Sequence, residues 1–187
     1  MTIKFIETKL PGVMLVEPQV YKDPRGYFLE TFNAAKYTQS SIPDKFLQDN
    51  HSHSERNTVR GLHYQLNQPQ GKLIYVVSGE IYDVCVDIRH GSPHFGHWYG
   101  CLLSMANHRQ MYVPEGFAHG FAVLSDSADV IYKCTRLYDA KDDRGILFND
   151  PELRIDWPIN KPLLSEKDRK NPTLAQLALE NLPVYTP

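Results

Sequence analysis

The chain has 187 residues, a length that favours one domain, and its 20 lysines and arginines nearly balance 22 aspartates and glutamates, for a net charge of -2. This balance and the lack of a basic run exclude nucleic acid as an expected partner. No uncharged apolar run is as long as a membrane helix, and charges interrupt the first ten residues, so we expect neither a membrane span nor a signal peptide. Cys85, Cys101 and Cys134 lack metal-type spacing and indicate buried thiols in a reducing, cytoplasmic compartment.

The N-terminal part of the chain predicts short strands separated by turns. Residues 12–20 are typical of a first strand, although Pro18 interrupts its pattern. The sequence DPRG at 23–26 predicts a turn, because proline fixes φ and glycine tolerates positive φ. An extended segment is expected at 27–32, and Asn33 is a candidate cap for one short helix that ends at Tyr37.

The middle of the chain has the most regular strand pattern. We expect strands at residues 59–65, 72–77, 81–88, 98–103, 110–113, 120–124 and 130–136, with turns rich in glycine, proline, serine and asparagine between them. In the run 81–88 apolar side chains alternate with Asp83 and Asp87, which predicts a strand buried on one side. Short strands at this density favour an all-β sandwich or barrel.

The C-terminal part is irregular around its prolines and charged from Ser165 to Lys170. Pro172 predicts the start of a helix, because proline fits the first helical turn. Leu174, Leu177 and Ala178 share one face of that helix, which we expect to pack on the domain. No repeat or domain boundary is evident, so residues 1–187 are expected to form a single domain with a packed C-terminal extension.

The stretch 59–65 carries a histidine that can hold or release a proton near neutral pH, His63. Alternation along an extended run places His63 on one face with Gly61, and Arg60 on the other. The histidine and the arginine can therefore line one pocket only if the strand bends or bulges near Gly61. The alternative interpretation is a histidine that only satisfies core contacts.

The chain also holds the side chains that proton abstraction beside a carbonyl requires: His63, Lys72, Tyr132, Tyr138 and Asp168. A neutral histidine can remove a proton when a carboxylate holds its other nitrogen. A lysine can stabilise an oxyanion, and a tyrosine hydroxyl can return a proton from another direction. Sequence spacing alone does not bring these groups together, and strand tyrosines are usually core residues with a polar tip.

Other polar residues have two interpretations each. Arg25 and Arg60 offer planar, permanently charged donors that suit phosphate oxygens, or they form surface ion pairs. Gln48, Asp49 and Asn50 can read the edge of a base, or they decorate a loop. We expect these groups to matter only if the fold brings them to one cavity.

A metal site is a further hypothesis, because His51 and His53 would share one face of a strand and His63 and His119 could join them. A His-x-His pair without a nearby acidic ligand is more often polar surface. Polar surface is therefore the favoured interpretation.

Seven motifs run through nearly the whole chain: DPRGYFLE at 23–30, QDNHS at 48–52, VRGLHYQ at 59–65, GK at 71–72, VPEGFAHGF at 113–121, YKCT at 132–135 and LSEKD at 164–168. With these motifs the sequence closely resembles the dTDP-4-dehydrorhamnose 3,5-epimerase family. Several of these motifs are long and all occur in the family's order, which argues against a chance match.

The resemblance implies a cupin-type jelly-roll β-sandwich with a few short helices, including one near the C-terminus, that works as a homodimer without metal or organic cofactor. It implies that His63 is the general base and that Asp168 is its partner. Lys72 would stabilise the enolate oxygen, Tyr132 would donate a proton on the opposite face, and Tyr138 would stack on the thymine.

The remaining positions that match substrate contacts in the family are Arg25, Glu30, Gln48, Asn50, Arg60, His119, Asp143 and Lys167. Asp143 stands where the family pattern commonly has glutamate, so its contact is the least secure of the set. The strand-exchanged dimer of the family would let Arg25 and Glu30 of one subunit reach the site of the other.

The reaction implied is inversion at C3 and C5 of dTDP-4-dehydro-6-deoxy-D-glucose, which gives dTDP-4-dehydro-L-rhamnose, usually for surface polysaccharide. A ketone at C4 acidifies the hydrogens on both neighbouring carbons, so one base and one oxyanion stabiliser can serve both centres. One alternative is a mono-epimerase that inverts only one centre of a related dTDP-4-keto-deoxysugar. A second is a metal-binding or non-catalytic cupin.

Overall fold

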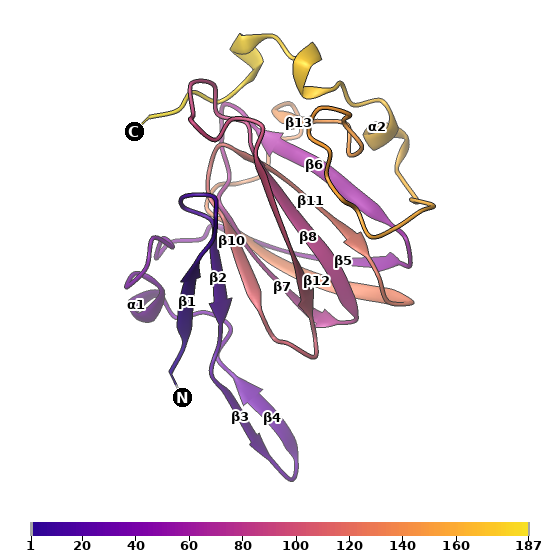
Figure 1. Cartoon of the computed structure of the whole chain (residues 1–187). Helices are drawn as coiled ribbons and strands as arrows, with labels where there is room; N and C mark the ends of the chain where they lie inside the picture. The colour runs from indigo at the N-terminus through magenta and orange to yellow at the C-terminus, as the bar shows by residue number, and fades with distance from the viewer. Residues whose placement is uncertain (1, 187) are drawn as a thin grey trace.

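A computed structural model describes residues 2–186 as two antiparallel sheets that pack face to face, with a separate hairpin (Figure 1). The larger sheet has the strand order β1 (Lys4–Glu7), β2 (Met14–Glu17), β10 (Gln110–Val113), β7 (Lys72–Ser78), β12 (Ser127–Cys134) and β5 (Gln48–Glu55). The smaller has the order β13 (Asp143–Gly145), β6 (Val59–Gln65), β11 (Phe117–Val123), β8 (Glu80–Asp87) and β9 (Trp98–Ser104). The hairpin consists of β3 (Val20–Asp23) and β4 (Gly26–Leu29).

The strands β5 to β12 have the connectivity of a jelly roll. Within the two sheets they lie in the orders β5-β12-β7-β10 and β6-β11-β8-β9, so the first strands of the series pair with the last. Such nested pairing folds one long antiparallel ribbon into two layers. The predicted all-β jelly-roll sandwich is confirmed.

The main core lies between the sheets and draws apolar side chains from both. Ile74 and Val130 come from the larger sheet, and Ile81, Phe117 and Phe121 come from the smaller. All five are buried. Burying one side chain of this size stabilises the fold by about 1.5–3 kcal/mol, so this layer supplies most of the force that holds the sheets together.

The prediction that β8 is buried on one side is wrong, because both of its faces are covered. Val84 and Val86 point away from the inter-sheet core and pack under Leu153, Leu174 and Leu182 of the C-terminal part. The C-terminal segment thus acts as a third layer, and α2 (Glu166–Arg169) lies beside β6 and β13 in Figure 1.

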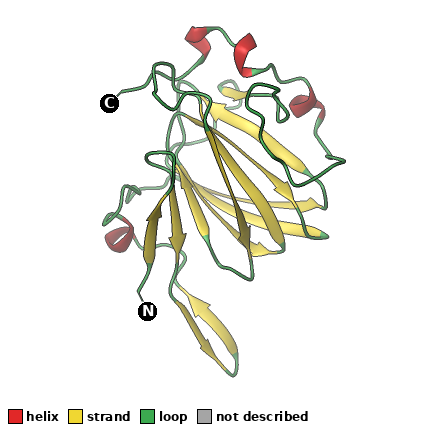
Figure 2. Ribbon diagram, in the orientation of Figure 1, coloured by secondary structure: helices red, strands yellow, loops and turns green. Residues whose placement is uncertain are grey.

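Helices are short and lie at the margins of the sheets (Figure 2). The helix expected to end at Tyr37 is present as α1 (Ala34–Tyr37), although the Asn33 side chain makes no capping hydrogen bond. The helix predicted from Pro172 is wrong: two 3-10 turns, η1 (Leu174–Gln176) and η2 (Leu179–Asn181), replace it. The packing expectation holds for Leu174, which is buried, whereas Ala178 is exposed.

Several strand boundaries differ from the predictions. The first strand was expected over residues 12–20, but β2 ends at Glu17 and β3 begins only at Val20, after Pro18 and Gln19. The sequence pattern does not predict β1, β5 or β13. Cys85, Cys101 and Cys134 all lie in strands as free thiols. No helix within residues 2–186 is both long and apolar enough to cross a membrane.

A bulge in β6 shapes the part of the fold where polar residues gather. On β11, His119 pairs with His63 and Phe121 pairs with Arg60, so two steps along β11 match three steps along β6. The extra residue resets the alternation of side chains. Arg60 and His63 therefore face the same side, which confirms that the strand bulges near Gly61.

Gly61 is required at this bulge for two reasons. Its φ of +114° lies in the region that glycine adopts readily. A Cβ added there would also lie 2.6 Å from the Cα of Gly120 and 2.6 Å from the carbonyl oxygen of His119. Backbone atoms on both sides leave no space for a side chain.

We expect Gly61→Ala to lower the free energy of unfolding by about 2–4 kcal/mol, because the new methyl group must push β6 and β11 apart. Gly91→Ala is the matched control, since Gly91 has φ +86° but no atom within 4 Å of the position that a Cβ would take. The control should cost only about 1–2 kcal/mol. Urea denaturation measures both values, and equal losses in the two variants would contradict the close approach at Gly61.

Candidate active site

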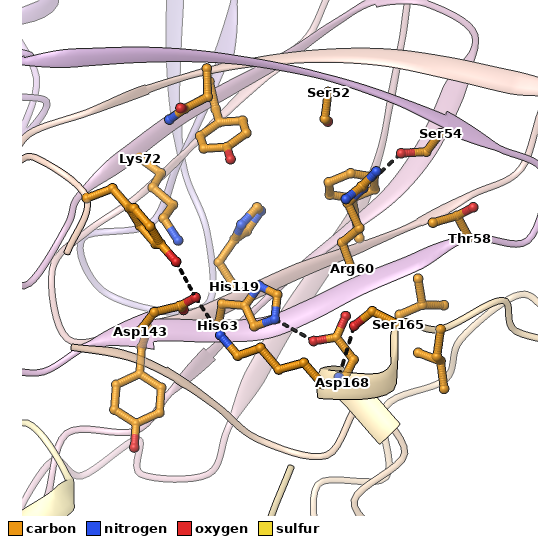
Figure 3. A pocket seen from close by; sticks show the side chains of 18 of the residues that line it. Ser52, Ser54, Thr58, Arg60, His63, Lys72, His119, Asp143, Ser165 and Asp168 are labelled. Carbon is orange, nitrogen blue, oxygen red and sulfur yellow. Dashed lines mark hydrogen bonds and ion pairs between the residues drawn. The ribbon is translucent and has the colours of Figure 1, made fainter. Parts of the chain in front are cut away.

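A cavity of about 710 Å³ lies between the two sheets and is lined by side chains from both, together with the segment from Leu163 to Asp168. Figure 3 shows this cavity with His63, Lys72, Arg60 and Asp168 converging on it. The predicted site residues that line it are Gln48, Asn50, Arg60, His63, Lys72, His119, Tyr132, Tyr138, Asp143, Lys167 and Asp168. Arg25 and Glu30 are the predicted site residues that do not.

A histidine–carboxylate pair stands on one wall of the cavity. His63 Nε2 lies 2.6 Å from Asp168 Oδ1. The Asp168 side chain is almost fully buried, whereas 31% of the His63 side chain is exposed. Because Asp168 occupies Nε2, and Nδ1 has no hydrogen-bond partner among residues 2–186, Nδ1 is left for a molecule in the cavity.

The short helix α2 holds Asp168 in place. Ser165 is its N-cap, with φ -68° and ψ 158°, and its hydroxyl oxygen accepts a hydrogen bond of 3.0 Å from the Asp168 backbone N–H. Burial on its own raises the pKa of Asp168. This effect is outweighed by the hydrogen bond and charge of His63 and by the hydrogen bonds from Ser165 and the Gly61 amide. The pKa of Asp168 therefore lies below its ordinary value. The carboxylate is therefore ionised at neutral pH.

Lys72 and Tyr132 enter the cavity from the larger sheet, opposite to β6. They lie on adjacent strands, since Tyr132 pairs with Ile74 and Cys134 pairs with Lys72. Burial lowers the pKa of Lys72. Burial raises the pKa of Tyr132. The phenol thus keeps its proton at neutral pH.

Two cations of the cavity have no carboxylate partner within residues 2–186. Arg60 donates from Nε to Ser54 Oγ at 2.9 Å and from Nη2 to the His53 carbonyl at 3.2 Å, both neutral acceptors. Lys72 takes part in none of the ion pairs among these residues. The cavity can therefore accept an anion without first breaking a salt bridge.

The rim of the cavity is a hydrogen-bonded chain of polar residues. Gln48 donates to Asn50 Oδ1 at 2.9 Å and accepts from the Tyr138 backbone N–H at 2.8 Å. The Tyr138 hydroxyl donates to Asp143 Oδ2 at 2.9 Å, and Lys167 also binds that carboxylate. The hydrogen bond to Asp143, helped by burial, raises the pKa of Tyr138. About half of Tyr138 is exposed, so its ring can receive a flat ligand.

His119 stands beside His63 as its partner on β11 and binds the buried Asp83 at 2.8 Å. The sequence pattern does not identify Asp83 as part of a site. It also misses Ser52, Ser54 and Ser165, all of which line the cavity. The alternation along β5 could have found the two serines, because they follow Gln48 and Asn50 on one face.

Arg25 and Glu30 lie on and beside the β3–β4 hairpin, which projects from the sandwich in Figure 1. The Arg25 side chain is 90% exposed and pairs with Asp23. Glu30 pairs with Lys36 at 2.8 Å. Within one chain these two residues do not reach the cavity.

The His-x-His pair lies at the surface of the edge strand β5. His51 Nε2 and His53 Nδ1 lie 2.9 Å and 3.1 Å from the same oxygen of Asp129. Within residues 2–186 no group of three or more histidine, cysteine, aspartate or glutamate side chains is arranged to hold a metal ion. The two histidines act here as hydrogen-bond partners of one carboxylate.

Comparison with known proteins assigns this arrangement to a family. A family model described as dTDP-4-dehydrorhamnose 3,5-epimerase matches residues 7–176. The chain belongs to the dTDP-4-dehydrorhamnose 3,5-epimerase family. The curated dTDP-4-dehydrorhamnose 3,5-epimerase of Methanothermobacter thermautotrophicus is 50% identical over 169 residues, which cover 89% of this chain and 91% of that relative.

Solved structures agree with the family assignment. The dTDP-6-deoxy-D-glucose-3,5-epimerase of Legionella pneumophila, in complex with dTDP-4-keto-L-rhamnose, superposes with a TM-score of 0.96 at 46% identity, covering 99% of this chain and 100% of that one. A dTDP-4-dehydrorhamnose 3-epimerase of Streptomyces niveus is 39% identical over 170 residues, 89% of this chain and 82% of the relative. This chain is therefore similar both to a 3,5-epimerase and to a 3-epimerase.

Proposed function

We propose that this chain inverts C3 and C5 of dTDP-4-dehydro-6-deoxy-D-glucose to give dTDP-4-dehydro-L-rhamnose, as an isomerase of rhamnose biosynthesis. The observation that carries the proposal is the His63–Asp168 pair on one wall of the cavity, opposite Lys72 and Tyr132 on the other sheet. This arrangement supplies a base, an oxyanion stabiliser and a proton donor to one bound sugar.

His63 is the general base. The Nε2–H of the ring donates to the ionised Asp168, so the lone pair of Nδ1 faces the cavity and can take a proton from the carbon beside the ketone. The carboxylate then stabilises the imidazolium that forms. Asp168 acts through His63 and does not itself touch the substrate.

Lys72 stabilises the charge that develops on the C4 oxygen. Removal of a proton from C3 or from C5 delocalises the electron pair onto this one oxygen, so a single ammonium group serves both steps. Lys72 has no ion-pair partner within residues 2–186, and the buried setting strengthens its attraction to an enolate.

Tyr132 returns a proton to the opposite face of the carbon. Inversion requires that the proton arrive from the side away from His63, and Tyr132 stands on the other sheet. Its pKa is raised by burial, so it holds a proton to give. Before the second centre reacts, solvent returns a proton to the Tyr132 phenolate and removes the proton that His63 took up.

The nucleotide is held by the polar groups farther out in the cavity. Arg60 offers charged N–H groups to the diphosphate, and Tyr138 offers an exposed ring on which thymine can stack. The remaining contacts are proposed for Gln48, Asn50, His119, Asp143 and Lys167. Asp143 already binds both Tyr138 and Lys167, which supports a role in positioning them despite its shorter side chain.

The alternative is a mono-epimerase, because the family also contains a dTDP-4-dehydrorhamnose 3-epimerase at 39% identity. The 3,5-epimerase of Methanothermobacter thermautotrophicus, at 50% identity, is the more similar of these two relatives and favours double inversion. The cytoplasmic location inferred from the cysteines stays a prediction.

In deuterated water we expect the enzyme to place deuterium at both C3 and C5 of dTDP-4-dehydro-6-deoxy-D-glucose, because each inversion replaces one carbon-bound hydrogen with a solvent one. NMR of the product counts the labelled carbons. Label at C3 alone would establish the mono-epimerase instead.

His63→Ala should lose at least about 10³-fold in kcat, and retained activity would contradict the assigned base.

We further propose that two chains form a homodimer in which the β3–β4 hairpin of one subunit completes the cavity of the other. A two-stranded hairpin is marginally stable alone. Here it carries the exposed aromatic side chains of Tyr21, Tyr27 and Phe28. The guanidinium of Arg25 at its tip is 90% exposed, and in the dimer it would exchange its surface ion pair with Asp23 for a diphosphate across the interface.

Complementation between two inactive variants tests this arrangement. Arg25→Ala and His63→Ala should each have low activity alone. After subunit exchange, a mixed dimer contains one cavity with an intact His63 that receives Arg25 from the other subunit. We expect about a quarter of wild-type activity to return in an equal mixture, as random pairing predicts.

The control for this experiment is a mixture of His63→Ala with Asp168→Asn, two residues of the same cavity wall in one chain. Such a mixed dimer has a defect in each cavity and should stay inactive. If Arg25 served its own subunit, the first mixture would stay equally inactive, which would contradict the exchanged hairpin.

A further inference from the structure

Asp83 is an unusual residue for the inter-sheet face of β8. Its neighbours on that face are Ile81 and Cys85, which belong to the main apolar core. Its side chain is fully buried. A carboxylate in such surroundings loses its hydration, so it needs strong partners to compensate.

Within the part of the chain that the structure describes, one of the two carboxylate oxygens of Asp83 has a partner and the other has none. Oδ1 lies 2.8 Å from His119 Nε2, whereas Oδ2 is buried without a hydrogen-bond partner among residues 2–186. Asp87, four residues along the same strand, is fully satisfied by Arg89 and by the Ser92 hydroxyl at 2.7 Å. Asp87 therefore has the contacts of a structural carboxylate and Asp83 does not.

A half-satisfied buried carboxylate does little to stabilise a fold, and apolar residues often replace one without loss. Groups of this kind concentrate at functional sites, where they orient or tune a neighbour. The neighbour here is His119, which lines the cavity next to His63 and within the same sheet. The arrangement repeats the histidine–carboxylate geometry of His63 and Asp168.

The hydrogen bond to Asp83 determines which ring nitrogen of His119 reaches the cavity. Nε2 points into the core toward Asp83, and Nδ1 has no partner among residues 2–186. His119 lines the cavity with the small part of its side chain that stays exposed. Without the carboxylate, the ring could turn or carry its proton on the other nitrogen.

We propose that Asp83 is a positioning residue that holds the Nε2 proton of His119 and thereby presents Nδ1 to the bound dTDP-sugar. The kinetic part of this inference rests on the proposed function, because it concerns the substrate of the same cavity. Asp83 acts through His119 and does not touch the substrate.

Kinetics of single and double variants test this coupling. Asp83→Ala should lower kcat/KM about 10- to 100-fold, mostly through a higher KM, because His119 contributes binding rather than proton transfer. Asp83→Asn keeps an acceptor for Nε2–H and should recover part of the loss. The double variant with His119→Ala should be no worse than His119→Ala alone.

Asp87→Asn is the matched control on the same face of β8. It breaks hydrogen bonds to Arg89 and Ser92 outside the cavity, so it should lower the Tm and leave kcat/KM of the folded enzyme unchanged. Substitution of Asp83 should thus weaken substrate binding, whereas substitution of Asp87 should lower only the stability. If the losses of kcat/KM in Asp83→Ala and His119→Ala multiply in the double variant, the two residues act independently, and the inference is overturned.

Two readouts do not depend on catalysis. NMR of the ¹⁵N-labelled histidine rings should show a proton on His119 Nε2 in the wild-type protein, and an unprotonated Nε2 would overturn the inference even if no Asp83 variant folds. The affinity for dTDP should fall in Asp83→Ala. Failure of the proposed epimerisation would leave both readouts intact, so the two hypotheses are tested separately.

Discussion

The contact between His63 and Asp168 joins two parts of the chain that are 105 residues apart, and the proposed chemistry depends on it. His63 stands on a strand of the inner sandwich, while Asp168 belongs to a four-residue helix in the outer C-terminal layer. That layer is held by Leu153, Leu174 and Leu182 against the outer face of the smaller sheet. The apolar packing of the C-terminal segment therefore fixes a carboxylate that the jelly roll itself lacks.

The cavity requires polar side chains between the sheets, where a jelly roll normally has apolar core residues. Two features of the fold allow this. The bulge at Gly61 turns Arg60 and His63 to one side, at the expense of a regular ladder between β6 and β11. The edge strand β5 presents polar side chains inward along its length, so the inter-sheet core stops where the cavity begins. Burial in this setting lowers the pKa of Lys72 and raises that of Tyr132, which suits an enolate stabiliser and a proton donor.

The all-β class and most central strands could be predicted from the sequence. Strands such as β7 and β12 are short runs rich in apolar residues, and turn residues bound them. The strand β5 could not, since its inward residues serve a cavity and leave no apolar period to detect. The burial of β8 on both faces could not be predicted for a different reason. The C-terminal segment covers Val84 and Val86, and the local sequence pattern does not reveal this layer. Residue chemistry identified His63, Lys72 and Tyr132 as candidates, but only family resemblance linked them to Asp168. In the proposed homodimer Arg25 would reach the cavity of the other subunit, and such a contact between two chains has no local pattern in one sequence.

The most direct test of the account is the ratio of hydrogen exchange to inversion in Tyr132→Phe. If His63 removes the proton from one face and Tyr132 returns it on the other, the variant should still exchange the substrate hydrogens with deuterated water while inversion falls far behind. NMR follows exchange and configuration in one sample. Inversion that keeps pace with exchange in Tyr132→Phe would contradict the assignment of the two residues to opposite faces of the sugar.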